Sequence, residues 1–313
     1  MSYFLCALIL FTFAGLRTRG NDTFTYRNTY LNHIGTGMQA FKQVNWMLGA
    51  NPGYNITAIA LKTIGFSVQD YLMAYAAVTV SIYLWFIRKY SKNLSLSLYL
   101  FITIGCYLFA FAAIKQSLAT AIGLIGIDRY INRKKFGFFI WIAIAATFHP
   151  YVLMFLITPF LNFRVWSKWS YILICATIVA GIALRGLLGA IVYITDEIGE
   201  TYDVESFTGA GVNIIRVIVC MVPVCLSFLK RKQFLSQTGE DKKQKIVLDN
   251  LFLNLTFMNA SIMFVGLFGT ANYFARLANY FLIFQTISYP IVLSKFPKQN
   301  RKTISFFLVF LYF

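Results

Sequence analysis

Several ionisable and polar side chains stand at the ends of long apolar runs in this 313-residue chain. A charged group at membrane depth is costly, so it commonly faces a cavity and marks a functional site. In chain order these residues are Arg17, Arg19, Asp22, Lys115, Gln116, His149 and Arg276. If each apolar run crosses a membrane, all of them are predicted to face the same side of it.

This set of side chains is rich in cations and poor in carboxylates, which suits a polyanionic ligand. A guanidinium binds two phosphate oxygens at once, and phosphates of a lipid headgroup lie at this depth. His149 and Asp22 are the candidates for a general base. The plainer interpretation makes Arg17 and Arg19 interfacial anchors that reach the headgroups. It makes Lys115 a helix-end lysine and His149 a turn residue.

The elements that carry these residues are predicted to be transmembrane α-helices. The chain is 58% hydrophobic and 12% charged, whereas a soluble domain has roughly 25% charged residues. Several apolar runs are close to the roughly 20 residues that span a bilayer. The runs cover residues 2–16, 71–87, 94–114, 117–131, 136–148, 150–161, 170–194, 212–229, 246–268, 273–293 and 303–313. The expected fold is all-α, a polytopic transmembrane helix bundle of about ten or eleven membrane segments. We expect one domain over 1–313.

Clusters of Lys and Arg separate alternate runs and predict which loops are cytoplasmic. Most of the 28 basic residues lie in these clusters, of which 230–245 is the longest loop. The amino terminus is then cytoplasmic. The external side carries the segment 17–70 and an acidic loop at 195–211. Within the first of these, 54–66 is too short and too polar to span, so an interfacial helix is predicted.

Aromatic residues of the external segment have two interpretations. Tyr26, Tyr30, Trp46 and Tyr54 are typical of an interfacial aromatic belt, which is the favoured interpretation. The alternative is that external aromatic rings stack on sugars. For that role the candidates are Tyr26 and Tyr273.

Familiar cofactor and catalytic motifs do not occur in the sequence. It has no Walker A loop, GxGxxG, HExxH, GxSxG or DxD-type pair. Its cysteines lie within apolar runs, without a CxxC pair or a nearby His, and are predicted to be buried small hydrophobes: Cys6, Cys106, Cys175, Cys220 and Cys225. We therefore expect no metal and no cofactor. Because the basic residues do not form one continuous face, nucleic acid is not expected as a partner.

Four stretches of sequence, in this order, resemble the EpsG family of bacterial exopolysaccharide polymerases, which are Wzy-like. They are LRTRGNDTFTYRNTY (16–30), KQSLATAIGLIGI (115–127), RKKFGFFIWIAIAATFHPYVLMFLI (133–157) and NYFARLANYF (272–281). Two positions depart from the family's pattern. Lys115 stands where Arg is usual, which keeps the charge and loses the bidentate fork. Pro150 follows His149 where a small or polar residue is usual.

The resemblance implies transfer of a growing glycan from undecaprenyl diphosphate to a lipid-linked repeat unit. The reaction would take place on the external face of the bacterial inner (cytoplasmic) membrane, in exopolysaccharide, capsule or O-antigen biosynthesis. A GT-C-like glycosyltransferase architecture without metal or nucleotide is implied, with a flippase and a chain-length regulator as further partners. The implied diphosphate ligands are Arg17, Arg19, Lys115, Gln116 and Arg276. The alternatives are an O-antigen-ligase-like glycosyltransferase and a lipid-linked oligosaccharide transporter or flippase.

Overall fold

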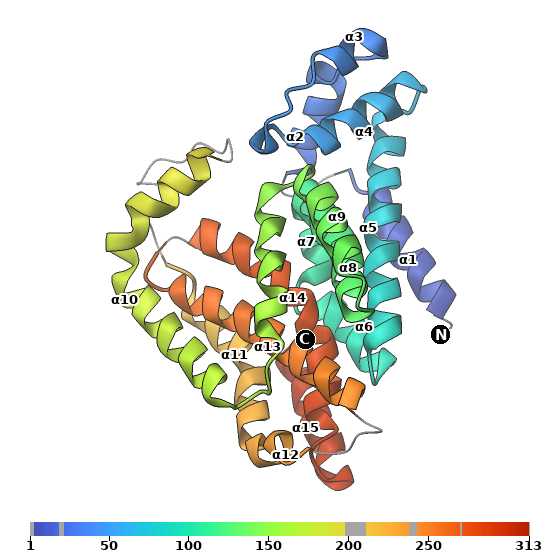
Figure 1. Ribbon diagram of the computed structural model, residues 1–313. Helices are drawn as coiled ribbons and strands as arrows, with labels where there is room; N and C mark the ends of the chain where they lie inside the picture. Colours follow the sequence, from blue (N-terminus) through green and yellow to red (C-terminus); the bar gives the residue numbers. More distant parts are fainter. Residues whose placement is uncertain (1–2, 19–21, 198–210, 238–242, 270, 313) are drawn as a thin grey trace. The chain divides into compact units, whose positions relative to one another are not determined.

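The computed structural model is built from helices (Figure 1), with 82% helix and no strand among the residues it describes. It describes residues 3–18, 22–197, 211–237, 243–269 and 271–312. The prediction of an all-α fold is confirmed. The described residues form two compact units. Unit 1 consists of the described residues within 1–89 and 107–156. Unit 2 consists of the described residues within 90–106, 157–197 and 201–313.

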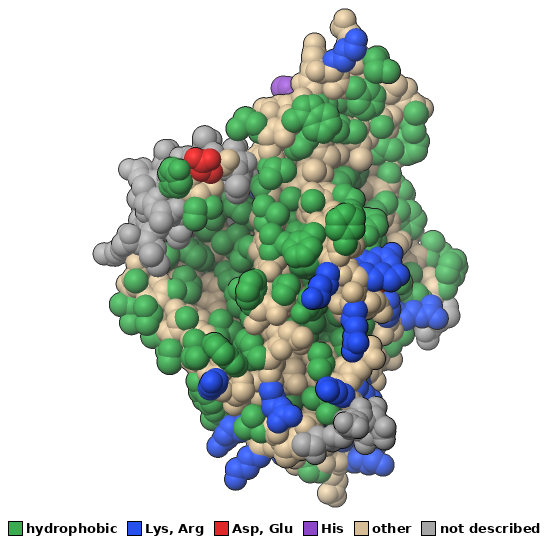
Figure 2. All heavy atoms as spheres, in the orientation of Figure 1, with side chains coloured by type: hydrophobic (Ala, Val, Ile, Leu, Met, Phe, Trp, Pro, Cys, Tyr) green, Lys and Arg blue, Asp and Glu red, His purple; other side chains and the backbone are tan. Residues whose placement is uncertain are grey.

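Long apolar helices make this a membrane protein. Within the described residues, α5 (Val68–Tyr90) and α13 (Lys243–Val265) are each long and apolar enough to cross a bilayer, and α6 (Leu94–Thr103) with α7 (Cys106–Ala112) forms a third candidate span. Shorter apolar helices include α1 (Tyr3–Gly15), α9 (Lys135–Ala146) and α11 (Ile214–Leu229). Hydrophobic side chains cover much of the face of each unit that Figure 2 shows. The number of spans and the GT-C-like architecture stay predictions.

The third candidate span is broken rather than continuous. α6 and α7 meet at an angle of 42°, and Gly105 between them has φ +95°, a conformation that glycine adopts without steric cost. The apolar run over 94–114 thus forms two helices with a bend between them. The break matters for the site because α7, on its far side, presents Leu108 and Phe111 to the groove described below.

Unit 1 also contains the external segment predicted at 17–70, which is largely helical. After α2 (Thr23–Asn28) come the π-helical turn η1 (Thr29–His33), α3 (Gly37–Lys42), the 3₁₀ turn η2 (Leu48–Ala50) and α4 (Pro52–Thr63). α4 is the helix that the sequence predicts near 54–66, and Pro52 in its first turn favours its start. The shorter helices were not predicted, because runs of six residues or fewer have too few turns to show a period.

The helices of unit 1 bring its basic loops together at one end, here called the basic end. There Lys89 at the end of α5 forms an ion pair with Asp128 on α8 (Ile114–Ile131). The guanidinium of Arg88 lies 4.8 Å from the centre of the Tyr3 ring at the start of α1. α1, α5 and α8 all have one end here, so their other ends point toward the opposite end of the unit.

The opposite end of unit 1, here called the tyrosine end, is closed by hydrogen bonds between distant segments. The side-chain amide of Gln69 donates to the carbonyl of Gly15, which joins the start of α5 to the end of α1. The backbone N–H of Gly53 donates to the carbonyl of Thr147 at 2.9 Å, which joins α4 to the end of α9. These contacts position the residues that the sequence analysis singled out in this unit.

Unit 2 packs α13 against α14 (Ala271–Leu293), α11 and α10 (Lys168–Glu197). Its basic residues also gather at one end, where Lys92 pairs with Asp249 and Arg164 donates to the carbonyl of Leu235. The loop predicted at 230–245 contains the short helix α12 (Arg231–Leu235). α15 (Lys298–Leu311) and the 3₁₀ helix η3 (Pro150–Leu161) complete the described elements. The acidic loop predicted at 195–211 lies mostly outside the described residues.

The cysteines divide into two groups. Cys6, Cys106 and Cys220 are buried as predicted, whereas Cys175 and Cys225 are exposed on α10 and α11. For these two residues the prediction of burial is wrong. An apolar helix of a membrane protein also presents small hydrophobes on its outer face, so position in an apolar run does not fix burial.

Candidate functional site

Arg17 is the most enclosed of the predicted cations that the structure describes, with 9% of its surface exposed. It follows α1, where its Nη1 donates to the carbonyl of Ala14 at 2.7 Å. Its Nε donates to Oγ1 of Thr23 at 3.2 Å, in the first turn of α2. The guanidinium carbon lies 5.6 Å from the centre of the Phe111 ring. The side chain is therefore fixed between the end of α1, the start of α2 and α7.

The electrostatic surroundings of Arg17 are unusual for a buried cation. Among the residues that the structure describes, no carboxylate forms an ion pair with it, and Thr23 and Ala14 accept two of its five N–H donors. Burial lowers the pKa of the guanidinium, while the hydroxyls of Tyr71, Tyr26 and Tyr107 raise it. A guanidinium is not deprotonated in proteins, so Arg17 keeps its charge. A buried charge of this kind favours an anionic partner.

A group of packed tyrosines lies beside Arg17. Tyr30 stacks on Tyr71 with ring centres 4.3 Å apart, and the hydroxyls of Tyr54 and Tyr71 are hydrogen bonded. Tyr75 joins them, its ring 4.9 Å from that of Tyr71. Tyr30 is 1% exposed and Tyr54 0%, so the prediction that these two belong to an interfacial belt is wrong. Buried tyrosine hydroxyls need hydrogen-bond partners. Tyr54 and Tyr71 bond each other, Tyr75 bonds the hydroxyl of Thr57, and Tyr30 donates to the carbonyl of Phe66.

The sequence allows only part of the tyrosine group to be predicted. Tyr71 and Tyr75 are four residues apart on α5 and therefore share a face, which a helical period predicts. Their partners Tyr54 and Tyr30 come from α4 and η1. Nothing in the local sequence of these two residues distinguishes them from tyrosines of an interfacial belt. Tyr26, half-buried at the edge of the group with its ring 6.2 Å from that of Tyr54, stays a predicted sugar contact.

Lys115 lies at the other side of the tyrosine group. Its Nζ stands 4.6 Å from the centre of the Tyr54 ring, a cation–π contact. The residue belongs to the first turn of α8, directly after the break that follows α7, and the neighbouring Gln116 is buried. Tyr54 and Tyr71 thus connect the surroundings of Lys115 to those of Arg17. The structure brings these two predicted cations to the same end of unit 1.

The two candidate bases also lie at the tyrosine end. His149 follows α9 by three residues and its ring is 5.3 Å from that of Tyr151. It stands two residues after Thr147, whose carbonyl accepts the hydrogen bond from Gly53, next to Tyr54. Asp22 directly precedes the Thr23 that binds Arg17, and its carboxylate does not cap α2. The choice between the two bases stays open.

Three further predicted residues are not brought into this group by described contacts. Arg19 lies outside the described residues. Arg276 is exposed on α14 and Tyr273 is half-buried against the apolar core of unit 2, around Phe274 and Ala278. Both belong to unit 2, at the end of α14 opposite Lys295 and its basic loop. The prediction that Arg276 shares a pocket with Arg17 stays a prediction.

Other cations of the segment 17–70 have structural roles instead. The ammonium of Lys62 donates to the carbonyls of Tyr30, Leu31 and Ile34 at 2.6–2.9 Å and so closes the end of the π-helical turn. Arg27 donates to the side chain of Gln69 at 3.2 Å. Arg17 differs from both of them in being almost completely buried.

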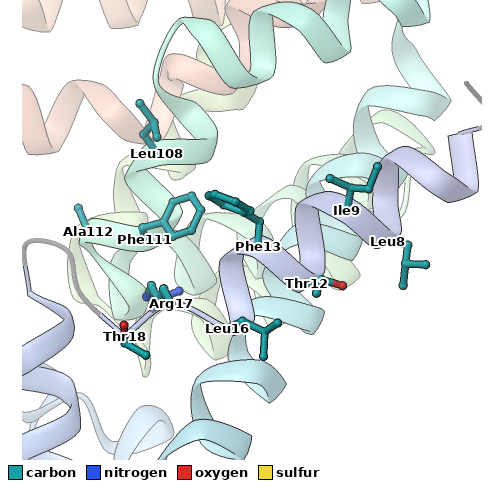
Figure 3. Close-up of a pocket in the computed structure, with 10 residues that line it drawn as sticks. All are labelled: Leu8, Ile9, Thr12, Phe13, Leu16, Arg17, Thr18, Leu108, Phe111 and Ala112. Carbon is teal, nitrogen blue, oxygen red and sulfur yellow. The ribbon is translucent and has the colours of Figure 1, made fainter.

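An apolar groove of about 1000 Å³ runs from Arg17 along the outside of α1 and α7. In Figure 3 the rings of Phe13 and Phe111 point toward each other, Arg17 and Thr18 lie at one end, and Leu8 and Ile9 lie farther along α1. The remaining lining residues are Thr12, Leu16, Leu108 and Ala112. Among the described residues that line it, Arg17 is the one that carries a charge. The groove thus combines apolar walls with a cationic end.

Gly53 permits the close contact that holds α4 against the end of α9. A Cβ at this position would lie 2.2 Å from Oγ1 of Thr147 and 3.1 Å from the ring of Phe148. We expect Gly53→Ala to destabilise the protein by about 1–3 kcal/mol, because the helices must separate. Thermal unfolding in detergent measures this. Gly137→Ala on α9 is the matched control, since its Cβ would meet only Arg129 at 3.4 Å; equal melting temperatures would refute the proposed contact.

These features define a class: an all-helical membrane protein that holds a buried arginine at the end of an apolar groove. The model of the EpsG family matches residues 1–313, the whole chain, and the protein belongs to that family. The resemblance seen in the sequence is thereby confirmed. Neither the curated proteins nor the solved structures include a significant match to this chain.

Proposed function

We propose that this protein is a polysaccharide polymerase. It transfers a growing glycan from undecaprenyl diphosphate to a lipid-linked repeat unit on the external face of the bacterial inner membrane. Membership of the EpsG family supports an exopolysaccharide-associated polymerase. The single observation that carries the finer proposal is the burial of Arg17 without a described carboxylate partner, at the end of an apolar groove. A diphosphate on a lipid chain has the charge and the apolar tail to fit that arrangement.

The proposed reaction is a glycosyl transfer that needs no nucleotide, because the donor is already a glycosyl diphosphate. The bond between the anomeric carbon and the diphosphate oxygen breaks, and its electron pair leaves with the diphosphate. A hydroxyl oxygen of the acceptor sugar forms the new bond and gives its proton to a base. Fixed cations near the leaving group stabilise the charge that develops on it in the transition state.

The proposed roles follow the charges of the side chains. Arg17 binds the leaving diphosphate through the N–H donors that Thr23 and Ala14 do not use. Lys115 adds a second positive charge at the same end of unit 1. Arg19 and Gln116 are further proposed ligands because they neighbour these two residues in the sequence, and Arg276 is a proposed ligand because of its charge. His149 or Asp22 takes the proton, and Tyr26 and Tyr273 contact the sugars.

The proposed orientation rests on the distribution of basic residues. Each unit carries its Lys and Arg clusters at one end, and such clusters mark the cytoplasmic side of a membrane protein. With the basic end of unit 1 in the cytoplasm, the tyrosine end and Arg17 face the exterior. This is the side on which lipid-linked repeat units are polymerised in the proposed reaction.

Purified protein in proteoliposomes tests the proposed function. Given undecaprenyl-diphosphate-linked repeat units alone, it should produce glycans of many repeat lengths and release undecaprenyl diphosphate in step with each bond formed. A product in which glycan is joined only to an unrelated lipid acceptor would indicate a ligase-like transferase. Movement of the intact substrate across the bilayer without new glycosidic bonds would indicate a transporter. Either result would overturn the proposal.

A further inference from the structure

The groove along α1 and α7 contains more exposed apolar surface than binding a headgroup requires. Phe13 is 73% exposed, Leu108 61% and Leu16 54%, although all three line one concave surface with Phe111. Its volume of about 1000 Å³ is at the upper end of the roughly 300–1,000 Å³ of small-molecule sites. Leu8 and Leu16 are about 12 Å apart along the helix axis. The groove is therefore long enough for a chain and not only for a phosphate.

Exposed Leu and Phe side chains are common on a membrane protein, where they contact ordinary lipid. The buried charge at the end of this groove is not common, because a guanidinium in apolar surroundings is costly unless an anion compensates it. Phe111 links the two features, since it lines the groove and its ring lies 5.6 Å from the Arg17 guanidinium carbon. A ligand that fits both must be a chain with an anionic head.

We propose that the groove between α1 and α7 holds the isoprene units nearest the head of a polyprenyl phosphate or diphosphate, with the phosphate at Arg17. This inference rests on the proposed function and adds to it a binding surface for the carrier lipid. The tail leaves past Leu8 and Ile9 into the bilayer. Binding the tail on a fixed helix face positions the bond to be broken relative to Arg17 and Lys115.

Leu8 and Leu5, both on α1, provide a matched pair of variants. Leu8 lines the groove and is 46% exposed, whereas Leu5, one turn earlier and 45% exposed, does not line it. Leu8→Trp should fill the groove, and Leu5→Trp should add the same bulk elsewhere on the same helix. Leu108→Trp fills the groove from α7 and serves as a second blocking variant if Leu8→Trp does not fold.

The test uses a polyprenyl phosphate with a photoreactive diazirine in its first isoprene units, in proteoliposomes of phosphatidylethanolamine and phosphatidylglycerol. Mass spectrometry of the wild-type protein should find the label on α1 and α7. Labelling should fall about tenfold, equivalent to about 1.4 kcal/mol, in Leu8→Trp and stay within about twofold of wild type in Leu5→Trp. Excess unlabelled polyprenyl phosphate should compete, and added phosphatidylglycerol should not.

Three results would overturn the groove proposal: label on other helices, wild-type labelling of both blocking variants, or equal competition by phosphatidylglycerol, which would make the groove a site for ordinary lipid. Labelling requires no catalysis. A protein that labels in the groove but polymerises nothing would refute the proposed function alone. A protein that polymerises but labels elsewhere would refute the groove alone.

Discussion

Arg17→Ala should reduce polymer by about 10²-fold or more, because loss of one preorganised donor from a transition-state anion has an effect of this size. The variant loses the guanidinium that is buried between α1, α2 and α7, and no other described residue that lines the groove carries a charge. Cells that produce it should accumulate single lipid-linked repeat units. The measurement is the length distribution of lipid-linked and free glycan, with protein amounts matched by immunoblot.

Arg27→Ala is the matched control for this prediction. It removes the same side chain from the same external segment, but Arg27 only donates to Gln69 and is not in the groove. Its polymer yield should stay within about twofold of wild type after correction for protein level. Arg17→Lys should recover part of the activity, since it keeps the charge and loses the fork. Long polymer from Arg17→Ala would remove this residue from the mechanism.

Arg276→Ala is expected to cause the second large loss, again about 10²-fold in polymer. Arg276 is exposed on α14, one turn into the helix and away from the basic end of unit 2. The proposal requires that its guanidinium reaches the same diphosphate that Arg17 binds. Single repeat units should accumulate, as is also expected for Arg17→Ala. The product lengths are measured in the same way.

The control for Arg276 is Arg231→Ala, which removes a half-buried arginine of α12 at the end of the same unit where its basic residues gather. This change should leave polymer length and yield near wild type. Arg276→Lys should restore activity in part if charge near the phosphate matters. If Arg276→Ala polymerises normally while Arg17→Ala does not, Arg276 is not a diphosphate ligand.

The sequence predicted the class of fold and the ends of most long helices, because apolar runs of bilayer length and alternating basic clusters are strong local signals. It did not predict the break at Gly105, since glycine within an apolar run is compatible with a continuous helix. It also missed the short helices of the external segment. Their stability comes from contacts such as Lys62 with three carbonyls, which join residues about 30 positions apart.

The candidate site was predicted as a set of residue types rather than as an arrangement. Charge at membrane depth identified Arg17 and Lys115, and the helix topology predicted that both lie at one end. Tyr30 and Tyr54 of the tyrosine group were interpreted as members of an interfacial belt, because the exposure of an aromatic ring cannot be read from a segment without a clear period. The groove was not predicted either, since it depends on how α7 approaches α1 after the break.

Glycan synthesis by wild-type and Arg17→Ala proteins, reconstituted side by side with undecaprenyl-diphosphate-linked repeat units and no nucleotide, tests the central claim most directly. We predict that the wild-type protein makes a ladder of long glycans and releases undecaprenyl diphosphate, while the variant leaves the repeat units unreacted. Equal ladders from the two proteins would contradict the role of Arg17. A wild-type protein that forms no glycosidic bond under these conditions would contradict the polymerase itself.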